Sequence, residues 1–500
     1  MTLTKISMNE NQYVPIDNSM DNESYEFLKK VIKTIEAGRH ILLHGMAGVG
    51  KSWTIKRIVN YLESQSKKVY VTALTGVAAL GLCDENLKVM ASTLHRFGGI
   101  GVANLSAETL ASRLQSQAIK RWRKCEILII DEVSMLGGGL FEKICTIAKI
   151  VRKSNIEPMG GIQLICSGDF FQLPPVKDKW VFQSKEWDAL NIRPFIMETP
   201  YRFNDKRFFE LLLRARKGHL TIEDCDLLNK RVGCYRRLSK MIQKMIEENP
   251  GEVIKPTMFF SRRNDVDNYN MRELDKLPGT EVVFQAIDSF EVLKGKPIKD
   301  DYMRILDDNA PIILSFKVGS QVMLKINLDV SLGLVNGSRG VVSEIIPNEA
   351  MIVKFLSLTL RVEMYKYKIE DKYAIATRTQ IPFILADSCT IHKSQGSTLD
   401  FIVVDSGPSV FEEGQAYVAL SRCRNLKGLL LSEFVPTSIK CNRNAFNYVK
   451  VLEEKAKREE DLYDAQNIYV NDLNESQGNE LQMWNNHIYN ESAKTTFSYK

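Results

Sequence analysis

The sequence predicts an α/β fold with two parallel-sheet units and a small β-rich insertion inside the second unit. Short, nearly uninterrupted apolar runs alternate with helical patterns in the first part of the chain, which is typical of parallel strands covered on both faces. The same alternation restarts near residue 258. At 500 residues, the chain is also too long for one compact core.

The first unit is predicted to begin with a helix over residues 26–39. Apolar residues recur there at helical spacing, and Gly38 lies where the helix is expected to end. A Gly-rich turn then leads from the first strand into a second helix that starts near Ser52. The predicted strands of this unit are residues 41–43, 69–72, 127–130 and 163–167.

The second unit repeats this pattern and contains an insertion. We predict strands at residues 258–260 and 401–404 and a helix at about residues 415–420. Short strand-like runs and Gly turns occupy about residues 278–375, and Asn336-Gly337 among them is a hairpin signal. The predicted domains are a tail at 1–25, a first domain at 26–215 with a short insertion at about 96–124, a second domain at 216–445 that contains the small β-barrel, and a charged helix with a polar tail at 446–500.

Composition limits the class of protein. The sequence has no run near the ~20 apolar residues that a membrane-spanning helix needs, and its start lacks the pattern of a signal or transit peptide. Nine scattered cysteines without a C-x-x-C pair argue against a zinc site or a disulfide framework. The net charge of +6 is compatible with nucleic-acid binding but is weak evidence for it. We expect an intracellular protein without a membrane partner.

A phosphate-binding motif follows the first predicted strand. The pattern G-x-x-x-x-G-K-[ST] is matched by Gly45, Met46, Ala47, Gly48, Val49, Gly50, Lys51 and Ser52. Backbone N–H groups of such a loop wrap a phosphate, and the following helix N-terminus adds partial positive charge. Lys51 is expected to reach the β- and γ-phosphates and Ser52 to hold Mg²⁺, with Trp53 completing the nucleotide segment. The alternative is a Gly-rich turn with an accidental Lys-Ser.

Two carboxylates end the third predicted strand. Asp131 and Glu132 follow Leu128-Ile129-Ile130. Asp131 is placed to hold Mg²⁺ and Glu132 to polarise an attacking water, although an acidic turn at a strand end is common by itself. Together with the Lys51 loop, this pair predicts a nucleoside triphosphatase.

Further segments occur in a fixed order along the chain. They are residues 72–79, 92–97, 131–135, 168–176, 201–203, 390–398 and 416–422. The two longest are Gly168-Asp169-Phe170-Phe171-Gln172-Leu173-Pro174-Pro175-Val176 and Thr390-Ile391-His392-Lys393-Ser394-Gln395-Gly396-Ser397-Thr398. Over about residues 25–435, this set resembles the Pif-type (petite-integration-frequency) DNA helicases of superfamily 1B, which are related to the RecD-like group. The resemblance implies two RecA-like parallel-sheet P-loop domains, with a small SH3-like β-barrel inserted in the second.

The resemblance also implies roles for single residues at the nucleotide. Gln172 is expected to sense the γ-phosphate, and Arg202 and Arg422 to act as arginine fingers that stabilise charge on the transferring phosphoryl group. Without the motif context, either arginine would be read as part of a surface ion pair. Gln395 and Gly396 are expected to face the nucleotide from the second domain.

Five residues resemble the family's contacts to the DNA backbone, namely Thr75, His95, Thr390, His392 and Lys393. Hydroxyls, amides and cations hold phosphates without reading bases, as a motor on any sequence requires. For two aromatic residues, Phe97 and Phe171, the sequence allows two interpretations, stacking on bases or packing in the core. The basic run of residues 120–124 is open between DNA contact and a solvated helix face.

The family pattern fails at two places. The family carries a glutamine before the first helix that recognises adenine, whereas residues 21–25 contain none and Gln12 lacks the right context. Phe203 stands where the family commonly has glutamine. The first departure puts selectivity for adenine in doubt.

The resemblance implies an ATP-dependent DNA helicase that uses ATP and Mg²⁺, moves 5′→3′ on single-stranded DNA and unwinds duplex DNA. The implied partners are single-stranded and forked DNA, with replication or repair proteins as further candidates, and the expected state is a monomer in a DNA-containing compartment. The alternative is an ATP-switched DNA-binding subunit that does not unwind DNA by itself. Replication, repair, recombination and the removal of G-quadruplexes or R-loops all remain open as the pathway, and telomere maintenance is a further process that the resemblance suggests.

Overall fold

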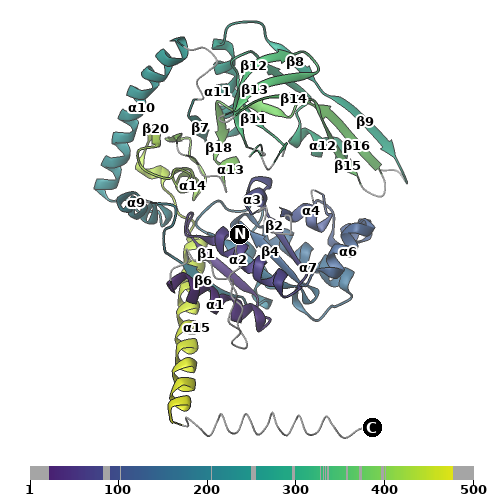
Figure 1. Ribbon diagram of the computed structural model, residues 1–500, viewed down its shortest axis with the longest axis vertical. Coiled ribbons are helices and arrows are strands. Elements are labelled where there is room, and N and C mark those ends of the chain that lie inside the picture. The colour runs from purple at the N-terminus through teal and green to yellow at the C-terminus, as the bar shows by residue number, and fades with distance from the viewer. Residues whose placement is uncertain are drawn as a thin grey trace, which may run out of the picture. The chain divides into compact units, whose positions relative to one another are not determined.

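The computed structural model describes residues 22–476 apart from short internal gaps. The gaps are residues 83–90, 102, 204, 249–254, 295–298, 327, 330–331, 333, 335–336, 356–357, 371–373, 396–398 and 400. The described chain contains a first lobe built on a six-stranded sheet, a second lobe built on a four-stranded sheet, and antiparallel sheets inserted in the second lobe (Figure 1). The predicted α/β class is therefore confirmed.

The sheet of the first lobe is entirely parallel, in the order β3-β2-β4-β5-β1-β6. Its strands are β1 (Ile41–Gly45), β2 (Val69–Ala73), β3 (Ser92–Thr93), β4 (Ile127–Asp131), β5 (Gln163–Gly168) and β6 (Arg193–Met197). Every residue of β1 and β4 is buried, as expected for strands covered on both faces. The four strands predicted in this lobe are confirmed, and two further strands, the two-residue β3 and the five-residue β6, form the edges of the sheet.

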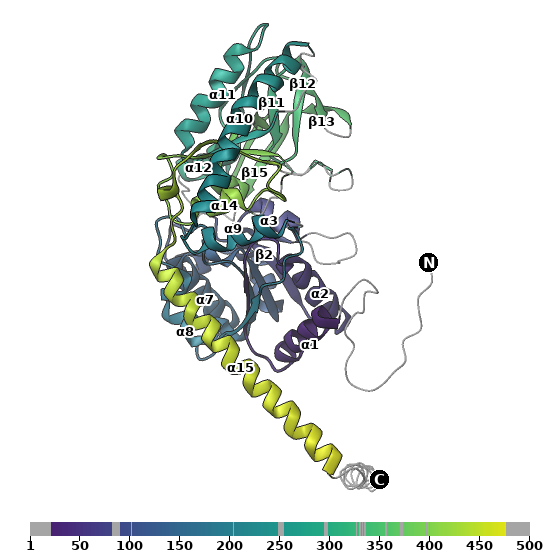
Figure 2. The ribbon, with the colours of Figure 1, turned by 90° about the vertical axis from the view of Figure 1, so that its left-hand side faces the viewer.

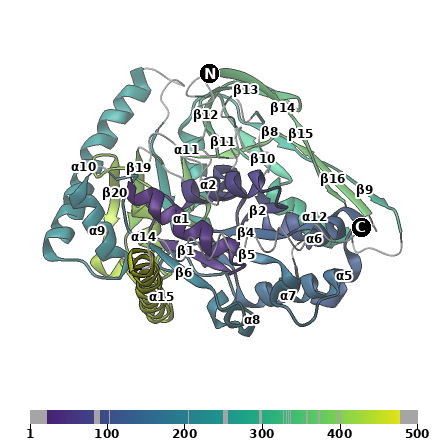
Figure 3. The same ribbon diagram turned by 60° about the horizontal axis from the view of Figure 1, so that its bottom comes forward.

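Helices cover both faces of this sheet. Figure 2 shows α1 and α2 on one side and α7 and α8 on the other, and Figure 3 shows α1 and α2 side by side. The helices of this lobe are α1 (Asn22–Glu36), α2 (Lys51–Ser64), α3 (Gly76–Gly81), α4 (Leu94–Gly98), α5 (Ala107–Arg113), α6 (Ser116–Lys124), α7 (Gly138–Arg152), α8 (Lys185–Ala189) and α9 (Lys206–Arg216). Apolar side chains of α1, α2 and strands β1, β2, β4 and β5 form one core.

The second lobe has a parallel sheet in the order β18-β7-β19-β20. Its elements are α10 (Ile222–Glu248), β7 (Thr257–Phe260), α11 (Arg263–Lys276), β18 (Ser388–Thr390), α13 (Ile391–Ser394), β19 (Ile402–Ser406), α14 (Gln415–Leu420) and β20 (Leu429–Phe434). The long α10 packs along β20 (Figure 1), where the Arg231 guanidinium donates to the carbonyls of Leu429 and Lys427 at 2.6 and 2.8 Å.

The inserted segment has its own antiparallel sheets and its own apolar core. Its elements are β8 (Val282–Gln285), β9 (Ile287–Val292), α12 (Lys299–Asn309), β10 (Ile313–Phe316), β11 (Gln321–Leu324), β12 (Arg339–Ile346), β13 (Ala350–Phe355), β14 (Thr359–Glu363), β15 (Tyr365–Glu370), β16 (Ala374–Gln380) and β17 (Phe383–Leu385). A five-stranded sheet runs in the order β14-β13-β12-β11-β17. The β-rich insertion is thus observed, while its SH3-like closure and the domain boundaries stay predictions.

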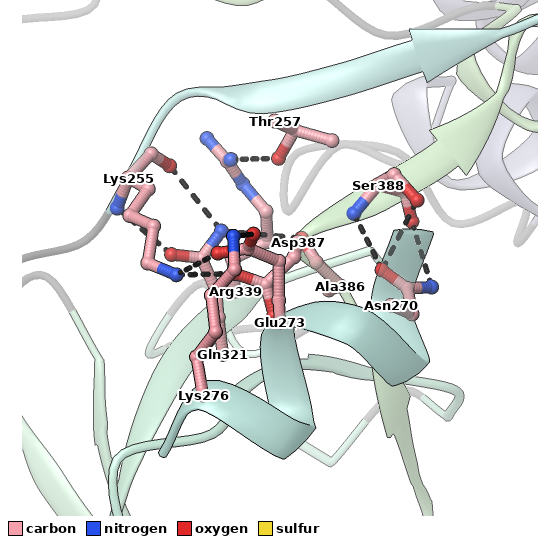
Figure 4. Close-up of polar contacts among 10 residues, drawn as sticks. All are labelled: Lys255, Thr257, Asn270, Glu273, Lys276, Gln321, Arg339, Ala386, Asp387 and Ser388. Atoms are coloured by element: carbon pink, nitrogen blue, oxygen red, sulfur yellow. Dashed lines mark hydrogen bonds and ion pairs between the residues drawn. The ribbon is translucent and has the colours of Figure 1, made fainter. Parts of the chain in front are cut away.

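A polar network joins the insertion to the second lobe (Figure 4). The Lys255 ammonium lies 2.9 Å from both Glu273 and Asp387, and Glu273 also pairs with Lys276. The side chain of Gln321 donates to the backbone carbonyls of Lys255 and Ala386 at 3.2 and 3.1 Å. These bonds join three parts of the second lobe to β11 of the insertion. The three parts are the segment before β7, helix α11 and the segment between β17 and β18.

The last helix, α15 (Arg443–Ser476), is continuous over the described residues and longer than the charged helix predicted from the sequence (Figure 2). None of the helices within the described residues combines the length and the apolar character that crossing a bilayer requires.

Candidate nucleotide site

The phosphate loop lies at the carboxyl end of β1, where two glycines adopt left-handed backbone angles. Gly48 has φ +83° and Gly50 has φ +86°, a region that favours glycine. The Gly48 carbonyl accepts hydrogen bonds from the backbone N–H groups of Tyr201 and Arg202 at 2.9 and 3.1 Å. A Cβ atom at Gly48 would lie 2.6 Å from that of Arg202. The loop and the segment that carries the predicted arginine finger are therefore packed directly together.

The Lys51 side chain turns back into the loop. Its Nζ donates to the carbonyl oxygens of Gly45 and Met46 at 2.7 and 2.8 Å. Burial lowers the pKa of Lys51, and the charges of Asp169 and Glu132 oppose that shift. Of the other loop residues, Met46, Ala47 and Val49 are buried.

The two residues after Lys51 face outward at the start of α2. Ser52 is exposed. Trp53 is also exposed, and the Arg57 guanidinium lies 5.0 Å from the centre of its ring.

The two carboxylates lie where the sequence predicts them, at the end of the buried strand β4. Burial, followed by the charge of Glu132, raises the pKa of Asp131 to about 6. Glu132 has φ +55°, a left-handed conformation that costs a residue with a side chain about 1 kcal/mol or more. A buried carboxylate beside a second one is poorly stabilised without a cation, so Asp131 fits Mg²⁺ by the chemistry of its oxygens.

Eight buried side-chain polar atoms of the described residues lack a hydrogen-bond partner, and three of them belong to predicted site residues, namely Gln172 Oε1, Gln395 Oε1 and Arg202 Nη1. Buried polar atoms in native proteins are almost always paired. A triphosphate with its attacking water supplies both acceptors for the guanidinium and donors for the amide oxygens.

Two groups of the second lobe join this site. Gln395 Nε2 donates a 3.0 Å hydrogen bond to Glu132 Oε2. The Arg422 side chain is buried, with Nε donating to the Val418 carbonyl at 2.9 Å and Nη2 to Ser421 Oγ at 3.1 Å.

The two predicted arginine fingers lie close enough to repel each other. Burial and then the charge of Arg422 lower the pKa of Arg202 to about 10. Burial also lowers the pKa of Arg422, and Glu132 opposes that shift. Two guanidinium groups that repel each other favour a nearby anion, as a γ-phosphate would provide. The structure thus brings Lys51, Asp131, Glu132, Gln172, Gln395 and both arginines together.

The predicted DNA residues are distributed over both lobes. Thr75 Oγ1 accepts from the Ala78 backbone N–H at 3.1 Å and so caps α3. His95 is half-buried in α4, and burial lowers its pKa. In the second lobe, Thr390 ends β18 and His392 Nε2 lies 3.0 Å from Glu412. The backbone of Lys393 lies in α13 but its side chain, like the whole of Gly396, lies outside the described residues.

Both aromatic residues that were open between base stacking and the core are core residues. Phe97 is buried against Trp122 and Tyr70, with ring centres 4.8 and 5.2 Å apart. Phe171 is buried with the Arg216 guanidinium 4.6 Å from its ring centre. The base-stacking alternative is therefore wrong for both.

The basic run of residues 120–124 is divided between packed and exposed side chains, with Lys120, Arg123 and Lys124 exposed, so DNA contact and a solvated helix face both stay predictions. It forms the end of α6, where Trp122 is buried and the Arg121 guanidinium donates to the carbonyls of Phe97 and Arg96.

One residue beside the loop was not predicted as part of the site. Tyr201 is 56% exposed, and its ring lies 3.2 Å from where a Cβ atom of Gly50 would be. Its hydroxyl makes a 2.7 Å hydrogen bond with Ser24 in α1. The signal was its position directly before Arg202 in the chain.

Known proteins resemble this chain over most of its length. A family model described as PIF1-like helicase matches residues 19–222, and one described as DNA helicase Pif1, 2B domain, matches residues 309–345. The Danio rerio protein named ATP-dependent DNA helicase PIF1 is 36% identical over 457 residues, which are 88% of this chain and 65% of that protein. The Saccharomyces cerevisiae protein named ATP-dependent DNA helicase RRM3 is 30% identical, and the match covers 85% of this chain and 67% of that protein. The chain thus spans about two thirds of the length of these relatives.

Solved structures agree with these matches. The crystal structure of Pif1 helicase from Candida albicans has a TM-score of 0.72 and 32% identity, covering 87% of this chain and 99% of that chain. The structure of Bacteroides Pif1 bound to ssDNA has a TM-score of 0.60 and 25% identity, covering 87% and 97%. The two parallel sheets are accordingly those of RecA-like P-loop domains. Because the chain is more than 30% identical to a solved Pif1 structure that it covers almost completely, it belongs to the PIF1-like helicase family.

Proposed function

We propose that the protein is an ATP-dependent DNA helicase that translocates on single-stranded DNA, in the 5′→3′ direction, and opens duplex DNA at forks. The observation that carries the proposal is the hydrogen bond from Gln395 to Glu132, since it places a second-lobe amide on a first-lobe carboxylate beside the phosphate loop. A nucleotide bound there would touch both lobes and control their separation. The names of the relatives, and the ssDNA in the Bacteroides structure, support DNA as the substrate.

The residues divide the chemistry of hydrolysis among them. Lys51, Arg202 and Arg422 supply positive charge for the oxygens of the γ-phosphate, where negative charge develops during transfer. Glu132 accepts a hydrogen bond from the attacking water and orients it, and the Gln172 amide contacts the same water. Ser52 and Asp131 would hold Mg²⁺, which neutralises charge on the phosphates when bound.

The DNA residues suit a sequence-independent grip. Thr75 and His95 come from the first lobe, and Thr390, His392 and Lys393 from the second. Each set would hold phosphates through side-chain O–H and N–H donors, and Lys393 adds a cation to the second set. Because α13 carries His392 and ends immediately before Gln395, a change at the nucleotide passes to the DNA grip within one turn. Alternate gripping by the two lobes then yields stepwise travel.

The test is unwinding by the purified chain of forked DNA with either a 5′ or a 3′ single-stranded tail. We expect opening of the 5′-tailed substrate with ATP, and none by a Lys51→Ala variant that still binds DNA. The exposed Lys67 offers a matched control, because Lys67→Ala removes an ammonium without touching the loop. Opening of only the 3′-tailed substrate overturns the direction, and DNA-stimulated hydrolysis without any opening favours the ATP-switched subunit.

A further inference from the structure

A buried carboxylate stands at the contact between the two lobes. Asp169 follows β5 directly and is 0% exposed. It accepts hydrogen bonds from Arg216 Nε and Nη2 at 3.1 and 2.8 Å and from the Phe171 backbone N–H at 3.2 Å. Its Oδ2 atom accepts a 2.9 Å bond from the hydroxyl of Tyr417 on α14 of the second lobe. A side chain of one lobe thus completes the hydrogen bonding of a buried charge in the other.

The same first-lobe turn carries the predicted γ-phosphate sensor. The Asp169 carbonyl accepts from the Gln172 backbone N–H at 2.9 Å. Gly414, which precedes α14 with φ +78°, comes so close that a Cβ atom there would lie 2.6 Å from the Phe171 carbonyl oxygen and 2.7 Å from that of Gln172. Gly414 and Tyr417 are three residues apart, so both lie on the side of the α14 turn that meets the loop.

The opposite end of α14 leads into Arg422. The guanidinium of Arg422 is held by Val418 and Ser421, the residues that follow Tyr417 in the helix. Any movement of α14 relative to the 169–172 turn therefore carries the arginine with it. The Tyr417 hydroxyl bonds this helix to the sensor turn through a side chain.

We infer that Tyr417 is a positioning residue for hydrolysis. Its hydroxyl, bonded to Asp169, fixes the position of α14, and with it Arg422, relative to the turn that carries Gln172. This role rests on the proposed ATPase function. Tyr417 does not act on the nucleotide itself. It fixes where Arg422 and Gln172 stand relative to each other when the γ-phosphate arrives.

Charges around this bond keep the donor and the acceptor in the required states. Burial works to raise the pKa of Asp169, but the charge of Arg216 and its hydrogen bonds prevail and hold that pKa below its usual value. Burial and the charge of Asp169 raise the pKa of Tyr417 well above 10, while a hydrogen bond with the Ala47 backbone of the phosphate loop opposes the shift. The carboxylate stays ionised and the phenol stays protonated at neutral pH, so the bond is permanently charge-assisted.

The test is steady-state ATP hydrolysis by the full chain with saturating single-stranded DNA, comparing wild type with Tyr417→Phe. The variant keeps the ring and loses only the hydroxyl. We expect kcat to fall about tenfold while KM for ATP changes less than twofold, because an interaction that acts only in the transition state lowers kcat alone. Gly414→Ala, which pushes the helix from the turn, should show the same kinetic pattern.

Two further measurements separate positioning from a merely structural role. Tyr61→Phe removes a buried hydroxyl that bonds Glu36 inside the first lobe, and it should leave kcat within twofold of wild type. In an Arg422→Ala background, Tyr417→Phe should change the residual rate by less than twofold, because its effect passes through Arg422. Two outcomes overturn the inference. One is a further tenfold loss of rate when Tyr417→Phe is added to Arg422→Ala, and the other is an unchanged kcat of Tyr417→Phe alone with only a lower melting temperature. A wild-type chain without DNA-stimulated hydrolysis refutes the proposed function instead.

Discussion

The amide nitrogen of Gln395 and the Glu132 carboxylate lie 3.0 Å apart across the two lobes. The carboxylate belongs to the residue that we propose orients water, and the amide comes from the segment that we propose grips DNA. Glu132 is also held in a left-handed backbone conformation, which sets the direction in which its side chain leaves the backbone. The bond therefore links the chemistry of one lobe to the position of the other.

Gln395→Ala should lower kcat for DNA-stimulated ATP hydrolysis about tenfold, the effect of losing one charge-assisted hydrogen bond of about 1.4 kcal/mol. DNA binding without nucleotide should be unchanged. Gln65→Ala, at an exposed glutamine after α2, is the matched control and should hydrolyse ATP like wild type. Equal kcat values for Gln395→Ala and the control would contradict the prediction.

Tyr201 should recognise the base of the nucleotide by stacking. Its exposed ring beside Gly50 offers a flat apolar face, and residues 22–36 contain no glutamine that could read the edge of adenine. Stacking is tolerant because every base has a π-face. We expect ATP and GTP to give KM values within about threefold of each other, and Tyr201→Ala to raise both about tenfold. A wild-type preference for ATP above a hundredfold would show that another group reads adenine.

His44 should make the stability of the apo protein depend on pH. Burial, followed by the charge of Arg216, lowers the pKa of His44 to about 3. Below about pH 6.5, the His44 imidazole therefore binds a proton in the unfolded chain but not in the folded chain. The free energy of unfolding consequently decreases as pH falls. Between pH 6.5 and 5, wild type should lose about 2 kcal/mol more unfolding free energy in urea than His44→Gln does.

The glutamine in this variant can still accept the bond that the Phe170 backbone N–H donates to His44 Nε2. His219→Gln changes an exposed histidine and should keep the pH dependence of wild type. If His44→Gln and wild type lose stability in parallel, the imidazole titrates equally in the folded and unfolded chains and the prediction fails.

Lys255 should anchor the insertion. Its ammonium, 23% exposed, lies 2.9 Å from the nearly buried Asp387 and from Glu273. Lys255→Met leaves these carboxylates without their shared cation and should lower the unfolding free energy by about 2–3 kcal/mol. The control is Lys276→Met at the other, 65% exposed, partner of Glu273, which should cost less than about 1 kcal/mol. Equal effects of the two variants in thermal unfolding would contradict this role.

Local sequence patterns correctly predicted the elements that are buried on both faces, because burial there requires a continuous run of apolar residues. Strands β1, β2, β4 and β5 and the helix α14 were predicted within one or two residues of their observed bounds, because an uninterrupted apolar run has few alternatives. The short strand β3, only two residues long, carries too little pattern to be recognised. Phe97 illustrates a further limit, since a motif shows that an aromatic is needed but not whether its ring faces DNA or the core.

The residues of the nucleotide site could be predicted from motifs. The contacts between the two lobes could not be predicted from those motifs. Lys51, Asp131 and Gln172 meet because parallel strands deliver their carboxyl ends to one edge of the sheet. The Tyr417–Asp169 bond joins residues 248 positions apart, and only the packing of two lobes shows it. Pairwise contacts between lobes are a property of tertiary structure that one sequence does not display.

The β-rich insertion leaves the second lobe after α11 and returns at β18, and β18 is the direct sheet neighbour of β7. It occupies a single crossover between adjacent strands, with both of its ends gathered near Lys255 and Gln321. Lengthening or shortening such a loop costs little, because closure entropy grows only with the logarithm of its length. A change in the length of the insertion therefore leaves the strand order β18-β7-β19-β20 as it was.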